Sequence, residues 1–175
     1  NVAIGYGALG ANTINDNIAI GYLAMNLNTT GENNVVVGGY ALDANTTGNY
    51  NVALGKNALG ANTTASSNTA VGYSALLLNT TGASNVAVGY AALDANTTGA
   101  SLVAIGKDAL GANTTAGNNI AIGDGAMFLN TTGATNVGIG SSALGSNTTA
   151  ANNVSIGYAS MAANTTGANN ISIGS

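Results

Sequence analysis

The stretch Asn1-Val2-Ala3-Ile4-Gly5 opens the chain and returns as Asn17-Ile18-Ala19-Ile20-Gly21. Nine further copies begin at Asn34, Asn51, Asn68, Asn85, Leu102, Asn119, Asn136, Asn153 and Asn170. From Asn17 onward the copies are evenly spaced and define a 17-residue repeat, and only the first unit is one residue short. Repeats of fixed length are typical of proteins in which each unit packs against its neighbours. We therefore interpret residues 1–175 as a single segment of ten repeats and a stub, belonging to a longer repeat chain.

Positions two to five, counted from the first residue of each repeat, predict a short β-strand that ends in a turn. Position two is Val or Ile except at Thr69, position four is always Val, Ile or Leu, and position five is always Gly. β-branched residues favour strands, and Gly accepts the positive φ that a tight turn requires. A unit of this length has no room for two helices and their connections. We expect an all-β fold, a parallel β-solenoid of the β-roll type in which each 17-residue repeat makes one coil.

The rest of the repeat predicts a second strand followed by an asparagine ladder. Positions eight and nine, as in Ala41-Leu42, are expected to begin the second strand, with positions nine and eleven inside and position ten in solvent. Positions twelve and thirteen are Asn and Thr in all ten repeats that contain them. Stacked coils place like residues about 4.8 Å apart, which lets amide side chains hydrogen-bond along the stack. We interpret these asparagines as structural.

Position three predicts an oligomer. Alternation along the strand would direct positions two and four into the core of the coil, and position three away from it. Position three nevertheless carries small residues and no charge, and a strand that is apolar on both faces is buried on both faces. We therefore expect position three to face an oligomer axis, through Ala3, Ala19, Val36, Ala53, Ala70, Ala87, Ala104, Ala121, Gly138, Ser155 and Ser172.

The composition argues against several classes of function. The chain has no Cys or His, and its two lysines, Lys56 and Lys107, lie three coils apart, so nucleophilic catalysis has no base to use. We expect no enzyme activity. A net charge of −4 offers no basic face to nucleic acid, and no apolar run is long enough to span a membrane. The chain begins without the charged and apolar regions of a signal peptide.

Two short motifs resemble a cofactor-binding motif and a metal-binding motif. Gly5-Tyr6-Gly7-Ala8-Leu9-Gly10 matches the dinucleotide-binding fingerprint, but the next repeat does not keep the pattern and no helix follows. Gly123-Asp124-Gly125 lacks the repeating acidic ligands of a calcium-binding solenoid. We expect neither a cofactor nor a metal.

The Asn-Thr-Thr triplets allow two further interpretations. They match the N-glycosylation pattern, although glycans about 4.8 Å apart would collide. A threonine array on a flat solenoid also suggests ice binding, but adjacent threonines such as Thr29 and Thr30 point to opposite faces, which leaves at most one outward Thr per coil. Ice binding is kept as a minor alternative.

A longer period of 51 residues, or three coils, overlies the shorter one. Lys56 recurs as Lys107, and Leu77 at position ten recurs as Phe128. Duplication of a three-coil block explains the period, and the alternative is that Leu77 and Phe128 contact a partner. Tyrosines at position six are the other candidate surface contacts, because Tyr beside hydroxyls and amides suits weak binding of proteins or sugars: Tyr6, Tyr22, Tyr73, Tyr90 and Tyr158.

The Asn-Val-Ala-Ile-Gly stretch resembles the head repeats of the trimeric autotransporter adhesins. The longer unit, with Gly-Tyr-x-Ala-Leu and Asn-Thr-Thr-Gly, is similar to repeats of viral and phage tail fibres. The adhesin resemblance implies a left-handed parallel β-roll, three chains packed around their inner strands, and binding to host surfaces. The adhesin repeat is typically shorter than the repeat of this chain.

From these patterns we predict a structural repeat segment of an extracellular fibre, at a cell or virion surface. It would self-associate as a homotrimer, end to end, or both, with weak adhesion to a host protein or glycan distributed along the rod. The alternative is a dedicated adhesin head or a viral tail-fibre receptor-binding module.

Overall fold

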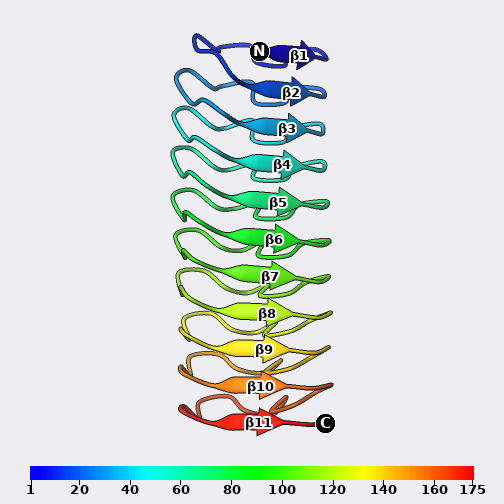
Figure 1. The fold of residues 1–175 in the computed structure, drawn as a ribbon, viewed down its shortest axis with the longest axis vertical. Coiled ribbons are helices and arrows are strands. Elements are labelled where there is room, and N and C mark those ends of the chain that lie inside the picture. The colour runs from blue at the N-terminus through cyan, green and yellow to red at the C-terminus, as the bar shows by residue number, and fades with distance from the viewer.

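The computed structural model describes all residues from Asn1 to Ser175 and shows a straight stack of coils with the two termini at opposite ends (Figure 1). Each coil contributes one short strand. The strands are β1 (Val2–Ile4), β2 (Ile18–Ile20), β3 (Val35–Val37), β4 (Val52–Leu54), β5 (Thr69–Val71), β6 (Val86–Val88), β7 (Val103–Ile105), β8 (Ile120–Ile122), β9 (Val137–Ile139), β10 (Val154–Ile156) and β11 (Ile171–Ile173).

The eleven strands form one parallel sheet in which every strand pairs with its neighbours in sequence. Like positions pair with like: Val52 lies opposite Thr69, and Ala53 opposite Ala70. The prediction of an all-β parallel solenoid with a 17-residue coil is confirmed, and no helix is present. In particular, none of the chain forms a helix with the length and apolar character that a membrane crossing needs.

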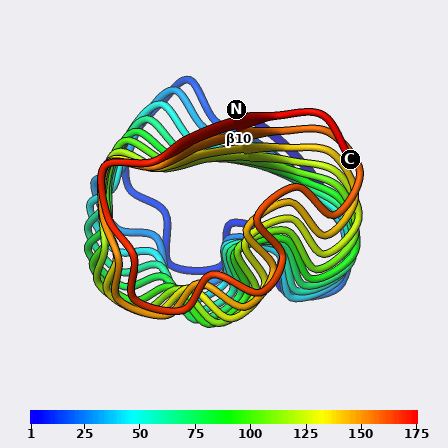
Figure 2. The same ribbon diagram turned by 90° about the horizontal axis from the view of Figure 1, so that it is seen from below.

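The predicted second strand is wrong. Positions six to eleven form consecutive turns, and Figure 2 shows them as the bent wall of the coil opposite the strands. Non-glycine residues there have positive φ at positions seven and nine, such as Asn57 with 62° and Leu59 with 53°. Alternating signs of φ bend the backbone too sharply for a strand. The turns still bond along the stack, because Leu42 N–H donates to the Ala58 carbonyl at 2.9 Å.

Position three points into the coil, which corrects the expected orientation of the strand. From β2 to β10 its side chains are buried, whereas positions two and four are half-buried or exposed. The leucines and methionines of position nine reach the same interior from the turn wall and are fully buried in the inner coils. These side chains leave little room for the residue at position three. A Cβ added to Gly138, for example, would come within 2.9 Å of Met127 Cγ.

The residues expected to face an oligomer axis therefore lie inside their own coil, and that assignment is wrong. It concerned Ala3, Ala19, Val36, Ala53, Ala70, Ala87, Ala104, Ala121, Gly138, Ser155 and Ser172; of these, only Ala3 and Ser172, in the two end coils, are not buried. These residues are small because bulky position-nine side chains face them, and close packing excludes a second large residue. Position eleven is also corrected: Leu27, Leu78 and Leu129 point outward and are about half exposed.

Two buried asparagine ladders hold the coils together. At position twelve, Asn62 Nδ2 donates to Asn45 Oδ1 at 3.0 Å, and the same contact recurs along the whole stack. At position one, Asn34 Oδ1 accepts the backbone N–H of Asn51 at 2.9 Å. The carbonyl of Gly48 joins the ladders, because it accepts from both Asn34 and Asn45. No buried side-chain nitrogen or oxygen lacks a partner, and the predicted structural role of position twelve is confirmed.

Glycine at position five is required both by backbone conformation and by the spacing of the coils. Gly72 has a φ of +133°, and a Cβ there would lie 2.7 Å from the carbonyl carbon of Gly89 in the next coil. Any side chain would force the two coils apart. The positive φ predicted for this turn is confirmed in all eleven coils.

We predict that Gly72→Ala lowers the free energy of unfolding by at least about 3 kcal/mol, because it combines an unfavourable φ with a clash against backbone. Gly39→Ala is the control: its added Cβ would meet nothing closer than the Tyr22 carbonyl oxygen at 3.8 Å, and its effect should stay within about 0.5 kcal/mol. Urea unfolding followed by circular dichroism measures both. Equal losses in the two variants would contradict the proposed role of position five.

We predict that Asn62→Ala lowers the free energy of unfolding by about 3 kcal/mol, because it leaves the Asn79 amide and the Ala65 carbonyl without this buried partner. Thr64→Ala, two residues away, removes an exposed hydroxyl that makes no hydrogen bond within the chain, and should change stability by no more than about 0.5 kcal/mol. The same urea titration tests both variants. A loss for Asn62→Ala that is no larger than for Thr64→Ala would show that the ladder contributes little.

Candidate functional site

The outer surface of the sheet is an apolar strip with one polar residue. It consists of the side chains at positions two and four of every strand, and we call it the Val/Ile face. No member is buried, and exposure reaches 39% at Ile105 in the middle of the stack. The members are Val2, Ile4, Ile18, Ile20, Val35, Val37, Val52, Leu54, Thr69, Val71, Val86, Val88, Val103, Ile105, Ile120, Ile122, Val137, Ile139, Val154, Ile156, Ile171 and Ile173.

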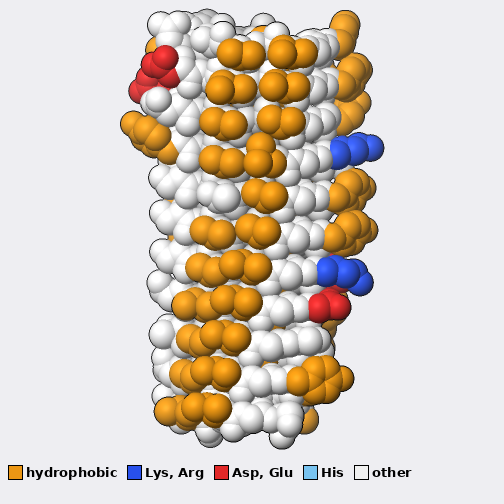
Figure 3. Space-filling view, turned by 45° about the vertical axis from the view of Figure 1, so that its right-hand side comes forward, with side chains coloured by type: hydrophobic (Ala, Val, Ile, Leu, Met, Phe, Trp, Pro, Cys, Tyr) orange, Lys and Arg blue, Asp and Glu red, His pale blue; other side chains and the backbone are white.

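Figure 3 shows the Val/Ile face as two adjacent columns of hydrophobic side chains along the molecule, one of them with a single gap, and with charged side chains only at the margins of this view. At the strand spacing of a sheet, eleven strands extend roughly 50 Å. Contiguous apolar surface on this scale marks an interaction site in soluble proteins. Thr69 is its only polar side chain. The apolar residues at positions two and four were evident from the sequence. They were expected in the core, because the two faces of the strand were assigned the wrong way round.

The predicted tyrosine contacts lie on the surface beside the sheet, and four of the five form two stacked pairs. Tyr6 stacks on Tyr22 with ring centres 5.5 Å apart, and Tyr73 stacks on Tyr90 at 5.4 Å. Tyr158 is 70% exposed and pairs with no other ring. Tyr40, at position seven, packs its edge against Tyr22 at 5.3 Å and so extends the first pair. The candidate residues are thus exposed, but mutual stacking covers part of their rings.

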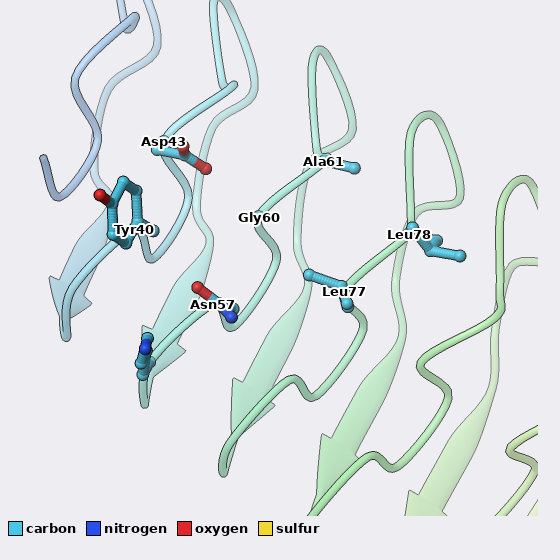
Figure 4. A pocket seen from close by; sticks show the side chains of 8 residues that line it. Tyr40, Asp43, Asn57, Gly60, Ala61, Leu77 and Leu78 are labelled. Carbon is cyan, nitrogen blue, oxygen red and sulfur yellow. The ribbon is translucent and has the colours of Figure 1, made fainter.

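The predicted apolar contacts, Leu77 and Phe128, line two separate hollows on the turn wall. The first hollow has a volume of about 560 Å³, and its lining combines residues of three coils: Tyr40, Asp43, Lys56, Asn57, Gly60, Ala61, Leu77 and Leu78. In Figure 4, Tyr40 and Asp43 stand on one side, Leu77 and Leu78 on the other, and Gly60 lies between them. The second hollow, of about 400 Å³, is lined by Asp108, Gly125, Phe128, Leu129, Ser142, Gly145, Ser146 and Ala162.

The Asn-Thr-Thr triplets expose fewer polar groups in the folded chain than their sequence suggests. In the inner coils the Asn of each Asn-Thr-Thr triplet is fully buried and its amide is hydrogen-bonded, so the folded rod presents no free nitrogen for glycosylation. Thr46 Oγ1 donates to the Thr63 carbonyl at 3.1 Å, while Thr47 is exposed. One outward Thr per coil is present, as expected. No group of three acidic side chains gathers that could hold a metal ion.

A comparison of the chain with known protein families, curated proteins and solved structures finds no match. A parallel β-solenoid, which is the general fold that the adhesin resemblance implied, is present, but membership of the adhesin or tail-fibre families is not established.

Two acidic side chains of the turn wall are held in unfavourable surroundings. Partial burial raises the pKa of Asp43 and of Asp94 above the ordinary value of 3.8, against an opposing effect of backbone N–H groups. Protonation is therefore easier in the folded than in the unfolded chain. These two carboxyl groups favour folding most when the pH is below their pKa in the unfolded chain. Their contribution to the free energy of unfolding is lost as the pH rises through their raised pKa in the folded chain.

We predict that Asp43→Asn raises the free energy of unfolding slightly at pH 7 and leaves it unchanged at pH 3. The amide cannot ionise, and Asn26 already occupies the same position in another coil. Urea unfolding at the two pH values makes the comparison. An equal gain at both values would show that removal of the charge is not the cause.

Proposed function

We propose that this chain is a structural segment of an extracellular fibre whose copies associate side by side through the Val/Ile face. The observation that carries the proposal is the exposure of apolar side chains along one face of all eleven strands, which Thr69 alone interrupts. Covering them releases water from a large apolar area, which is the main driving force for protein association. The fully paired asparagine ladders support a mechanical role, because they tie each coil to the next without disulfides or metal.

A second copy of the chain is the occupant that suits this face best. The face repeats once in every coil, so another rod in parallel register presents the same period and can match it along the whole length. A partner without that period would fit at few places. The face also carries no charge, which is typical of the core of obligate interfaces.

A homotrimer, with three Val/Ile faces turned to a common axis, is the arrangement that the resemblance to adhesin heads implies. A pair of rods packed face to face would cover the same side chains and is the alternative outcome of the mass measurement below. The extracellular location rests on the resemblance alone. Any adhesion outside the Val/Ile face would add to this structural role.

We predict that the protein forms a defined oligomer and that Val71→Lys with Ile122→Lys converts it to monomer. Both side chains belong to the Val/Ile face, and lysines there would place unpaired charges in the covered interface. Light scattering coupled to size-exclusion chromatography gives the mass. A loss of at least tenfold in association constant is expected for the double variant.

The matched control is Leu78→Lys with Leu129→Lys. These two leucines are also 51 residues apart and are 49% and 44% exposed, but they lie on the turn wall. This variant should keep the mass of the unaltered protein. The proposal fails if the unaltered protein is a stable monomer, or if the control dissociates while the Val/Ile variant stays assembled.

A further inference from the structure

The hollow at Gly60 joins an aromatic ring, an aliphatic wall and three polar side chains at one place on the turn wall. Its residues come from three consecutive coils, with Tyr40 and Asp43 in one, Lys56 to Ala61 in the next, and Leu77 and Leu78 in the third (Figure 4). None of them belongs to the Val/Ile face. A site here is independent of the side-by-side association proposed above, and it goes beyond the structural role.

The hollow exists because the middle coil has Gly60 and Ala61 at positions ten and eleven, where the next coil has Leu77 and Leu78. A Cβ on Gly60 would approach Leu77 Cδ1 at 3.3 Å and Asp43 Oδ1 at 3.6 Å, so the glycine forms a floor between an apolar wall and a carboxylate. Ala61 continues the floor. Recessed backbone between raised side chains is the form that small-molecule sites take, with a few polar groups to fix orientation.

The side chains around this floor differ in how firmly they are held. Tyr40 packs edge-on against Tyr22, with ring centres 5.3 Å apart and an angle of 66° between the rings. Asp43 is half-buried at the wall of the hollow. Lys56 makes no ion pair, because the one salt bridge of the chain joins Lys107 and Asp108. Its ammonium group therefore remains free to donate hydrogen bonds to a ligand.

The chemistry of the lining selects the class of ligand. The Tyr40 ring and the Leu77 side chain offer apolar surface to the C–H groups of a ring-shaped molecule. Asp43 accepts hydrogen bonds, Lys56 donates them, and Asn57 does both, which suits a set of neighbouring hydroxyls. The charges of Asp43 and Lys56 cancel, so the hollow does not favour a charged ligand. We propose that it binds one neutral hexopyranose unit of a glycan.

The three-coil block recurs 51 residues later, so the hollow can be compared with the equivalent place in the second block. There Ala91 replaces Tyr40, and Asp108 replaces Asn57 and pairs with Lys107 at 3.4 Å. Phe128 replaces Leu77 with a larger side chain beside the equivalent glycine: a Cβ on Gly111 would lie 3.0 Å from Phe128 Cε2, compared with 3.3 Å from Leu77 Cδ1 at Gly60. The only other hollow is lined by Asp108, Phe128 and Leu129 but not by Gly111 or Lys107. The repeat alone therefore does not create the site; the residues specific to the first block do.

The test uses saturation-transfer difference NMR on the full chain with the methyl pyranosides of glucose, galactose, mannose and N-acetylglucosamine. The method detects weak binding to large assemblies, and we expect a Kd of about 1 mM for at least one of the four sugars. Two substitutions copy the second block into the first, namely Tyr40→Ala and Leu77→Phe. Each should weaken binding about tenfold, the first by removing the ring and the second by filling the hollow.

These variants keep the fold intact, because Ala91 and Phe128 occupy the same positions of the repeat, and Ala91 has a φ of 51° where Tyr40 has 58°. Tyr50→Ala is the matched control, since Tyr50 is exposed, has a φ of 57° close to that of Tyr40, and lies outside the hollow. It should bind as the unaltered chain does. Absence of signal with all four sugars, or equal weakening in the Tyr50 variant, would overturn the proposal. Masses measured on the same samples test the self-association separately.

Discussion

The structure depends on the buried asparagine ladders, which oblige every coil to lie directly over the one before it. A buried amide without hydrogen-bond partners lowers the free energy of unfolding. Each asparagine side chain of the inner coils finds its partners only in the next coil and at the carbonyl of position fifteen. A shift of one residue would leave the whole ladder unpaired. The ladders thus set the register of a sheet whose strands are too short to set it alone. Leu102 is the one interruption: it is fully buried, and its backbone N–H still bonds to Asn85 Oδ1.

The narrow interior follows from that register and decides which residues are outside. Glycine at position five lets neighbouring coils approach to backbone contact, and leucine or methionine at position nine fills most of the remaining interior. Only small side chains fit opposite them at position three. The larger Val and Ile residues must then occupy the outer surface, although they are apolar. The exposed Val/Ile face is therefore a direct result of how little space the coil encloses.

A regular stack tends to repeat every surface feature, so a discrete binding site requires departures from the repeat. Along the turn wall the backbone hydrogen bonds persist while positions six, seven and ten vary freely. Tyr40, Lys56 and Leu77 come together from three adjacent coils because of the stacking, even though they occupy three different positions of the repeat. The scaffold can hold a site of this kind without change to its core. Self-association and ligand binding can thus use separate walls of the same rod.

The sequence by itself determined the parallel solenoid, its 17-residue coil, the structural asparagines and the glycine turn. The solenoid and its coil length follow from the periodicity, because like positions lie next to each other in stacked coils. The asparagine ladders and the glycine turn follow from the hydrogen bonding of Asn and the backbone freedom of Gly. The direction of the strand side chains was different: Val-Ala-Ile alternates equally well with either face inward, and the correct choice depends on Leu59 and its equivalents in the opposite wall. The turns at positions six to eleven depend on positive φ at non-glycine residues, which composition does not reveal. The hollow at Gly60 was hidden for a similar reason, since only the stacking of three coils brings Tyr40, Asp43 and Leu77 around one glycine.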